Sequence, residues 1–323
     1  MSVRFVDNPA RDVASLDITR EHVDRAETAV RRAGIEAQPF SRIDHTAADG
    51  SRRSLFVVFE SMQATGSFKV RGAVAFLAAH ADEVRARGVI AASAGNHGAG
   101  VAWQSHRQRT SATIVVPHGT PAIKRDKIES YGARLVLHGT GYDDAEAHAR
   151  ALATSTGALF VSAYDDVDIA AGNGGTLARD VLRTIGSNVD AVLVPVGGGG
   201  LASGFAAAAG PRVRVYGAQS EACPAMAESI ERGAAIESMR ARGSTFAEGL
   251  EGGVSKGAFD RARRALSGVY VVDEADIGRR IAFARDRWGV LIEGSSAVAL
   301  GAALQVDWIG EVGVVVLTGR NVD

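Results

Sequence analysis

The sequence predicts an α/β fold in which parallel strands and helices alternate in doubly wound sheets. Short apolar runs rich in valine and isoleucine, typical of buried strands, alternate with longer segments of helical periodicity along most of the chain. Many of the 38 glycines directly follow these runs, where the carboxyl ends of strands form binding loops. The length of 323 residues suits two domains of ordinary size.

The strands are expected wherever β-branched and apolar residues form a short run. The first expected helix, 18–33, precedes them and ends at Gly34, because glycine suits the left-handed position after a helix. Residues 35–53 are polar and are expected to be irregular. The expected strands are 55–59, 88–92, 112–116, 134–137, 158–161, 190–196, 213–218, 269–272 and 313–318.

The helices are expected between these strands. The helix after the first strand starts near Lys69, with Ser67 as its expected N-cap. Its apolar stripe has the spacing i, i+3, i+4, i+7 and consists of Val70, Ala73, Val74 and Leu77. Residues 164–176 and 237–257 are expected to be loops. Further helices are expected at 98–105, 121–131, 142–155, up to 185, after 200, at 224–232, 277–288 and 294–304.

The composition excludes several classes of protein. A net charge of −1 gives no electrostatic footprint for nucleic acid or an anionic membrane. The apolar runs are too short to span a bilayer, and the N-terminus has no features of a signal peptide. A single cysteine, Cys223, excludes a disulfide framework and a cysteine-based zinc site. We therefore expect a cytoplasmic protein that does not bind nucleic acid or membranes.

The stretch SMQATGSFKVRGA, residues 61–73, places Lys69 at the start of a helix. The positive end of the helix dipole disfavours the ammonium form there and so favours the neutral, nucleophilic amine. The same position also suits a nearby anion. In isolation, a lysine in a first helical turn is more often simply solvated, so the other motifs must support a role for Lys69.

A run of four glycines follows the apolar strand DAVLVPV and precedes an alanine-rich helix. Successive amides without side chains can converge on one anion at a helix N-terminus, and phosphate is the expected ligand. A flexible turn and a dinucleotide-binding fold are the alternatives, although GGGGLASG matches GxGxxG poorly. The run consists of Gly197, Gly198, Gly199 and Gly200.

Two further strand ends carry polar residues. At SAGNHG, residues 93–98, the free amides and the Ser93 hydroxyl suit a carboxylate, and Asn96 could bind a ring oxygen. The alternative is that Asn96 caps a helix and His97 is packed in the core. Thr318 stands at the carboxyl end of the last expected strand and could face a ligand or simply form a turn. The eight histidines show no metal-ligand spacing, and no GxSxG hydrolase element occurs.

Four motifs together resemble one enzyme family. TGSFKVRGA, SAGNHGAGVA, PVGGGGLASG and LTGRNVD occur in the order and spacing of the pyridoxal-phosphate enzymes of fold type II, the tryptophan-synthase-β type. Within that group the chain resembles the serine/threonine dehydratases over residues 18–323. The resemblance implies two doubly wound parallel-sheet domains, the smaller inserted in the larger. The large cofactor-binding domain would comprise 1–73 and 159–323, and the small substrate-side domain 74–158.

The resemblance also implies a role for each motif. Lys69 would form the Schiff base with the aldehyde of pyridoxal 5'-phosphate, and Phe68 would pack against the ring. The ring's 3-oxygen would be bound by Asn96, and its nitrogen by Thr318, at a position that is usually serine. Glu293 would lie near the ring, and the four glycines would hold the phosphate. The substrate carboxylate would be held by Ser93, Ala94, Gly95, Asn96 and His97.

The implied reaction is α,β-elimination from a β-hydroxy amino acid such as L-threonine or L-serine, giving a 2-keto acid and ammonia. A β-replacement enzyme or an amino acid racemase of the same fold is the near alternative, and a nucleotide-binding α/β protein without this cofactor is the distant one. Ala94 occupies the position of a second serine in related racemases, so we expect weak racemisation. Relatives are commonly homodimers or homotetramers.

Some positions depart from the family pattern. Gln219 and Ala225 occupy positions where many relatives bind a divalent cation through glutamate and aspartate, so no metal is expected there. Glu248 replaces the usual aspartate, and Arg320 replaces a glycine. Arg320 could be a surface residue, or it could indicate an unusual substrate or a phosphate contact.

Overall fold

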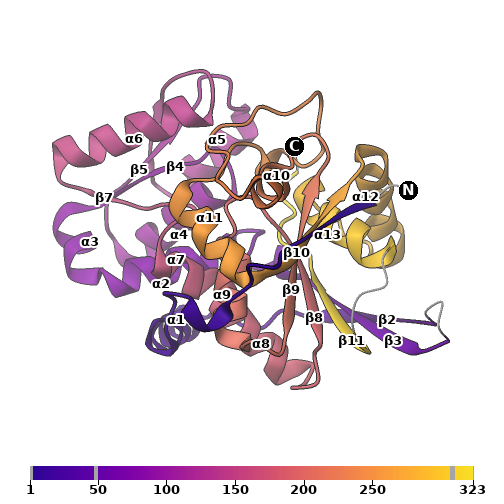
Figure 1. Ribbon diagram of the computed structural model, residues 1–323. Coiled ribbons are helices and arrows are strands. Elements are labelled where there is room, and N and C mark those ends of the chain that lie inside the picture. Colours follow the sequence, from indigo (N-terminus) through magenta and orange to yellow (C-terminus); the bar gives the residue numbers. More distant parts are fainter. Residues whose placement is uncertain (1–2, 47–49, 306–309, 323) are drawn as a thin grey trace.

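The computed structural model describes residues 3–46, 50–305 and 310–322. The strands of this part form two sheets, which lie on opposite sides of the molecule in Figure 1. The larger sheet has the order β1-β10-β9-β8-β11-β3-β2, and the smaller has the order β6-β5-β4-β7. The strands of the larger sheet are β1 (Val3–Asp7), β2 (Phe40–Thr46), β3 (Arg52–Val58), β8 (Ala191–Pro195), β9 (Arg214–Ser220), β10 (Leu266–Val272) and β11 (Val312–Val316).

The smaller sheet is parallel throughout and uses one continuous stretch of chain. Its strands are β4 (Val89–Ala92), β5 (Ala112–Val116), β6 (Arg134–Leu137) and β7 (Leu159–Phe160). The helices of this stretch are α3 (Ala81–Arg87), α4 (Asn96–Gln108), α5 (Ala122–Ser130) and α6 (Tyr142–Thr156). The last strand, β7, begins at residue 159, directly after the expected limit of the small domain.

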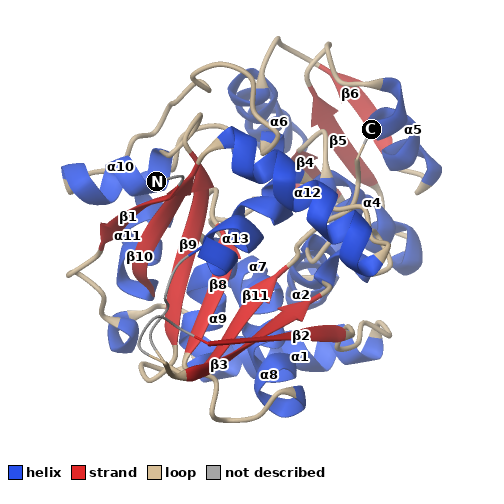
Figure 2. Cartoon of the chain, turned by 90° about the vertical axis from the view of Figure 1, so that its right-hand side faces the viewer, coloured by secondary structure: helices blue, strands red, loops and turns tan. Residues whose placement is uncertain are grey.

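Helices cover both faces of the larger sheet, as Figure 2 shows. On one face α12 (Glu274–Trp288) and α13 (Gly294–Gln305) pack together. The helices on the other side are α1 (Arg20–Arg32), α2 (Lys69–Ala79), α7 (Val167–Ala170), α8 (Thr176–Thr184), α9 (Gly200–Ala209), α10 (Ala225–Arg232) and α11 (Lys256–Ala265). Short 3-10 turns occur at η1 (Val13–Ser15), η2 (Glu60–Met62) and η4 (Glu248–Leu250).

The central strand β8 shows why the predicted strands formed. Val192 and Val194 belong to the core cluster under α9, whereas Leu193 belongs to the cluster under α13. All five residues of β8 are buried. A strand covered on both faces must be apolar at every position, and a continuous run of that kind is easily seen in a sequence.

Several expectations about local structure were wrong. Residues 35–53 were expected to be irregular but contain the edge strand β2, which pairs antiparallel with β3. The opposite edge strand, β1, is also antiparallel to its neighbour. The expected loop 164–176 forms α7 followed by η3 (Ala171–Gly175), a turn of π-helix.

The expected N-cap of α2 was wrong by one position. The N-cap is Phe68, whose side chain makes no capping bond. Ser67 instead forms an antiparallel β-bridge with Gly319, which draws it out of the helix. Its hydroxyl still accepts a weak hydrogen bond from the Lys69 amide at 3.4 Å.

A buried ionic cluster ties α2 to its surroundings. The guanidinium of Arg71 forms a two-pronged pair with the Glu60 carboxylate, both N–O distances being 2.8 Å. It also lies 2.9 Å from Asp180 on α8 and donates to the hydroxyl of Thr176 at 3.1 Å. The side chains of Arg71 and Glu60 are completely inaccessible to solvent. This cluster fixes the helix that carries Lys69.

No helix in the described part of the chain is long and apolar enough to cross a membrane.

Candidate active site

Lys69 is the first residue of α2, and it is partly buried. The Nζ atom donates to the carbonyl of Ala163 at 2.9 Å and lies 5.3 Å from the centre of the Phe68 ring. Desolvation by burial lowers the pKa of the Lys69 amine to about 8. A much larger share of this amine is therefore neutral near pH 7 than for an exposed lysine, and only the neutral amine is a nucleophile or base.

The lowered pKa gives a testable pH dependence. In protein freed of cofactor, trapping of an aromatic aldehyde on Lys69 by borohydride should reach half its maximal rate near pH 8, instead of near 10.5. The trapping rate should rise with pH, because deprotonation of the amine exposes its lone pair. Peptide mass mapping at each pH measures the modification. Lys256, which is largely exposed, is the internal control. A half-maximal rate for Lys69 at the pH of that control would contradict the prediction.

The segment after β11 closes over the start of α2. The Phe68 amide donates to the Thr318 carbonyl at 3.0 Å, beside the bridge between Ser67 and Gly319. Thr318 is buried, and its hydroxyl lies 3.2 Å from the hydroxyl of Ser296 on α13. Ser296 also accepts the Gly319 amide at 2.8 Å. The predicted residues Lys69, Phe68 and Thr318 are therefore neighbours, whereas Ser296 was not predicted because its helix looks like ordinary apolar core.

The four glycines form a loop in which three positions, Gly198, Gly199 and Gly200, have no room for a side chain. Gly199 has a φ of 83°, and a Cβ there would lie 2.5 Å from the Cβ of Ala262. A Cβ on Gly198 would lie 2.3 Å from the Tyr164 ring. The loop leads into α9, whose first-turn amides have no partner within the helix. Bare amides at a helix N-terminus form an anion cradle, and this one fits a phosphate group.

The segment Ser93–His97 likewise opens a helix. Gly95 is the N-cap of α4, and its amide donates to the Ser93 hydroxyl at 3.2 Å. Nε2 of His97 lies 3.0 Å from the Val161 carbonyl. Burial, with a smaller contribution from Lys69, lowers the pKa of His97 to about 3. The imidazole is therefore uncharged and packed inside, so His97 can offer an anion only its backbone amide.

Glu293 forms a polar cluster with two asparagines. Its carboxylate accepts the side-chain amide of Asn96 at 2.9 and 3.0 Å and the backbone amide of Asn321 at 2.7 Å. Burial raises the pKa of Glu293, and the bonds from Asn96 and Asn321 oppose that rise. Asn321 also donates its side-chain amide to Asn96. The sequence placed Asn321 in a motif but gave no sign of this contact.

The positions that depart from the family pattern lie as follows. Gln219 is buried, donates to the Val196 carbonyl at 3.0 Å and accepts the Ala227 amide at 2.9 Å. A neutral amide whose two hydrogen bonds go to the backbone thus occupies this position. Glu248 accepts a bond from Lys124 at 3.1 Å. The Arg320 side chain is exposed, in agreement with a surface role.

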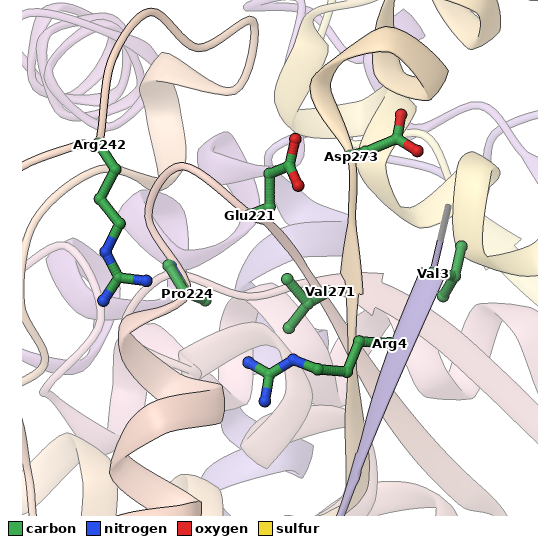
Figure 3. Close-up of a pocket in the computed structure, with 7 residues that line it drawn as sticks. All are labelled: Val3, Arg4, Glu221, Pro224, Arg242, Val271 and Asp273. Carbon is green, nitrogen blue, oxygen red and sulfur yellow. The ribbon is translucent and has the colours of Figure 1, made fainter. Parts of the chain in front are cut away.

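A hollow of about 340 Å³ lies elsewhere, at the carboxyl ends of β9 and β10 (Figure 3). Charged side chains of both signs surround it, and they bond to residues of neighbouring helices. Arg4 pairs with Glu231, Arg242 with Glu228, and Asp273 caps α12. Neither Lys69 nor the glycine loop lines this hollow.

Comparison with known proteins places the chain in a family. Residues 32–319 match the model of the family described as pyridoxal-phosphate dependent enzyme. The chain is 37% identical to an L-threonine ammonia-lyase of Thermotoga maritima over 277 residues, which cover 83% of this chain and 67% of that protein. It is 33% identical to the catabolic L-threonine dehydratase TdcB of Staphylococcus aureus, covering 90% of this chain and 85% of the relative. The chain thus spans about two thirds of the length of the ammonia-lyase.

Solved structures show the same fold. Serine racemase of Dictyostelium discoideum superposes with a TM-score of 0.84 at 28% identity, covering 95% of this chain and 99% of the racemase. The processed form of threonine deaminase isoform 2 from Solanum lycopersicum superposes with a TM-score of 0.82 at 27% identity, covering 98% of this chain and 88% of the deaminase. The glycine cradle and the partly neutral Lys69 amine fit the phosphate and the aldehyde of pyridoxal phosphate. The chain belongs to the pyridoxal-phosphate dependent enzymes, with the fold of the serine racemases and threonine deaminases.

Proposed function

We propose that this enzyme catalyses α,β-elimination of water from a β-hydroxy amino acid such as L-threonine or L-serine, releasing a 2-keto acid and ammonia. The observation that carries the proposal is a partly buried lysine of lowered pKa in the same site as a buried neutral hydroxyl, that of Thr318. Relatives named threonine ammonia-lyase and threonine dehydratase, 33–37% identical, support it.

The residues present would hold the cofactor at its phosphate, at its aldehyde and around its ring. Gly197, Gly198, Gly199 and Gly200 would receive the phosphate, and Lys69 would form the covalent link. Asn96 would bind the 3-oxygen of the ring, Thr318 its nitrogen, and Phe68 would pack beside it. Pyridoxal phosphate supplies an electron sink for the pair of electrons left when a Cα–H bond breaks.

The protein then handles the substrate's charges and protons. The amides of residues 93–97 and the Ser93 hydroxyl would hold the substrate carboxylate. Lys69, once free, would take the α-proton as a neutral amine, and its lowered pKa keeps it available near pH 7. Thr318 can accept or donate a hydrogen bond but carries no charge, so it does not hold the ring nitrogen protonated as a carboxylate would. A milder sink favours loss of a β-leaving group over transamination.

The remaining expectations follow from this proposal. The chain would comprise a large domain, 1–73 with 159–323, and an inserted small domain, 74–158, with substrate bound between them. We further propose a cytoplasmic homodimer or homotetramer.

The test is product release across a panel of β-hydroxy amino acids, with L-serine, L-threonine and an acidic 3-hydroxy amino acid included. Keto acid and ammonia should form in equal amounts, and conversion of L- to D-serine should be at least about tenfold slower, because Ala94 offers no acid or base on the second face of the ring. Chiral chromatography measures the inversion. A rate of conversion of L- to D-serine above the rate of keto acid release would instead support the racemase alternative. The structural likeness to serine racemase favours that alternative.

A further inference from the structure

Lys127, on α5, takes part in the polar cluster around Glu293. Its Nζ donates to the side-chain oxygen of Asn321 and, at 3.0 Å, to the carbonyl of Thr65. The side-chain nitrogen of Asn321 donates to the same Thr65 carbonyl at 2.9 Å and to the side-chain oxygen of Asn96. The side-chain nitrogen of Asn96 donates in turn to the Glu293 carboxylate. The four residues therefore form one continuous chain of hydrogen bonds.

The two ends of this chain determine the direction of every bond in it. A lysine ammonium is only a donor, and a carboxylate is only an acceptor. Asn321 must therefore turn its oxygen towards Lys127, which leaves its nitrogen for Asn96. Asn96 must then turn its oxygen towards Asn321 and its nitrogen towards Glu293. An asparagine amide alone has no preference between its two orientations, so its partners supply it. Those partners are Lys127 and the Thr65 carbonyl for Asn321, and Glu293 for Asn96.

Two glycines leave space for this chain of hydrogen bonds, because a side chain at either position would collide with it. Gly66 has a φ of 76°, and a Cβ there would lie 2.4 Å from the side-chain oxygen of Asn321. A Cβ on Gly319 would lie 2.6 Å from the Glu293 carboxylate. The contact also joins two parts of the molecule, because α5 packs against β6 of the smaller sheet whereas Asn321 follows β11 of the larger one. The backbone therefore accommodates this chain of hydrogen bonds where the parts of the molecule that carry the two sheets meet.

We propose that Lys127 is a positioning residue, which sets the orientation of the Asn96 side-chain amide through Asn321. The proposal rests on the proposed function, in which Asn96 binds the 3-oxygen of the cofactor ring. The Asn96 nitrogen carries two hydrogens and lies 2.9 and 3.0 Å from the two oxygens of Glu293, which in this proposal share one of those hydrogens. The other remains for the electron-rich 3-oxygen. In the reverse orientation Asn96 would present its own oxygen to that atom, and the two oxygens would repel each other.

The experiment compares Lys127→Met with Lys127→Arg in the holoenzyme and in protein stripped of cofactor. Methionine keeps most of the volume and loses the donor, whereas arginine keeps both donor and charge. We expect the dissociation constant of pyridoxal phosphate, measured by fluorescence titration, to rise about tenfold in Lys127→Met and to change less than about threefold in Lys127→Arg. The absorbance of the bound cofactor as a function of pH should shift in the methionine variant and not in the arginine variant.

A purely structural role would give a different pattern. In that case the melting temperature of the cofactor-free methionine variant would fall, while its cofactor affinity and spectrum stayed those of the wild type, and the proposal would be wrong. If the methionine variant does not fold, Lys127→Gln replaces it, because a glutamine amide no longer dictates which way Asn321 turns. The glutamine variant should then show a severalfold weaker affinity, and unchanged affinity would overturn the proposal.

Two controls separate this proposal from the proposed function. Lys256→Met makes the same replacement at an exposed lysine on α11 and should leave affinity and spectrum unchanged. A wild-type protein that binds pyridoxal phosphate but releases no keto acid would contradict the proposed function alone. A wild-type enzyme that turns over normally while Lys127→Met binds the cofactor equally well would contradict the role of Lys127 alone.

Discussion

Replacing Lys69 by alanine should lower kcat on the preferred amino acid by at least about 10³-fold. Two functions are lost together, because the same amine would link the cofactor and take the α-proton. The long-wavelength absorbance of the lysine-linked cofactor should disappear as well, while the phosphate cradle still binds the cofactor non-covalently. Stopped-flow absorbance and a coupled assay for the keto acid measure both effects.

The matched control for this prediction is Lys256→Ala, at an exposed lysine paired with Asp260. It should keep the absorbance and the turnover of the wild type. A small primary amine added to Lys69→Ala should restore part of the turnover, since it can supply a base within the vacated space. Turnover of Lys69→Ala above about a tenth of the wild-type value would contradict the role given to Lys69.

Replacing Arg71 by alanine should lower the free energy of unfolding by about 3–5 kcal/mol. The substitution leaves the Glu60 carboxylate buried without its two-pronged partner and removes the bond to Thr176. Breaking a fully buried ion pair is costly because the remaining charge keeps its desolvation penalty. Urea titration followed by tryptophan fluorescence, on protein without cofactor, measures the loss.

An exposed ion pair provides the comparison. Arg85 on α3 lies 2.9 Å from Asp82, and both side chains are largely in solvent. Arg85→Ala should therefore cost about 0–1 kcal/mol. Replacing Arg71 and Glu60 together by methionine and leucine should be less harmful than Arg71→Ala, since no charge of the pair is left behind. A loss below about 1 kcal/mol in Arg71→Ala would show that Glu60 is neutral or hydrated in the folded protein.

The strands between the edges of the larger sheet could be predicted because their residues are apolar on both faces, as β8 illustrates. The edge strand β2 could not be predicted in this way. Its sequence, FSRIDHT, is mostly polar, since an edge strand with one neighbour needs little apolar surface. The segment AGNGG of η3 was taken for a loop because of its glycines. Those glycines serve packing instead, for a Cβ on Gly174 would lie 2.1 Å from the Leu201 carbonyl of α9.

The candidate site shows the same division. Lys69 and the four glycines could be recognised locally, because each lies at a strand-to-helix junction whose amides or dipole suit a ligand. Other residues of the site could not be recognised in this way, because each contributes through contacts with residues far away in the sequence. They are Ser296, Asn321 and Lys127. Asn321 meets Asn96, 225 positions away, only after both sheets have formed.

The position of β11 between β8 and β3 also determines when the protein can become an enzyme during its synthesis on the ribosome. The smaller sheet, residues 89–160, can assemble once that stretch has emerged. The larger sheet cannot close until residues 312–316 are made, and until then β3 and β8 present facing, unpaired edges. The hydrogen bond from the Phe68 amide to the Thr318 carbonyl cannot form before then either. Until β11 has been translated, the nascent chain is thus most prone to aggregate and cannot complete its candidate site.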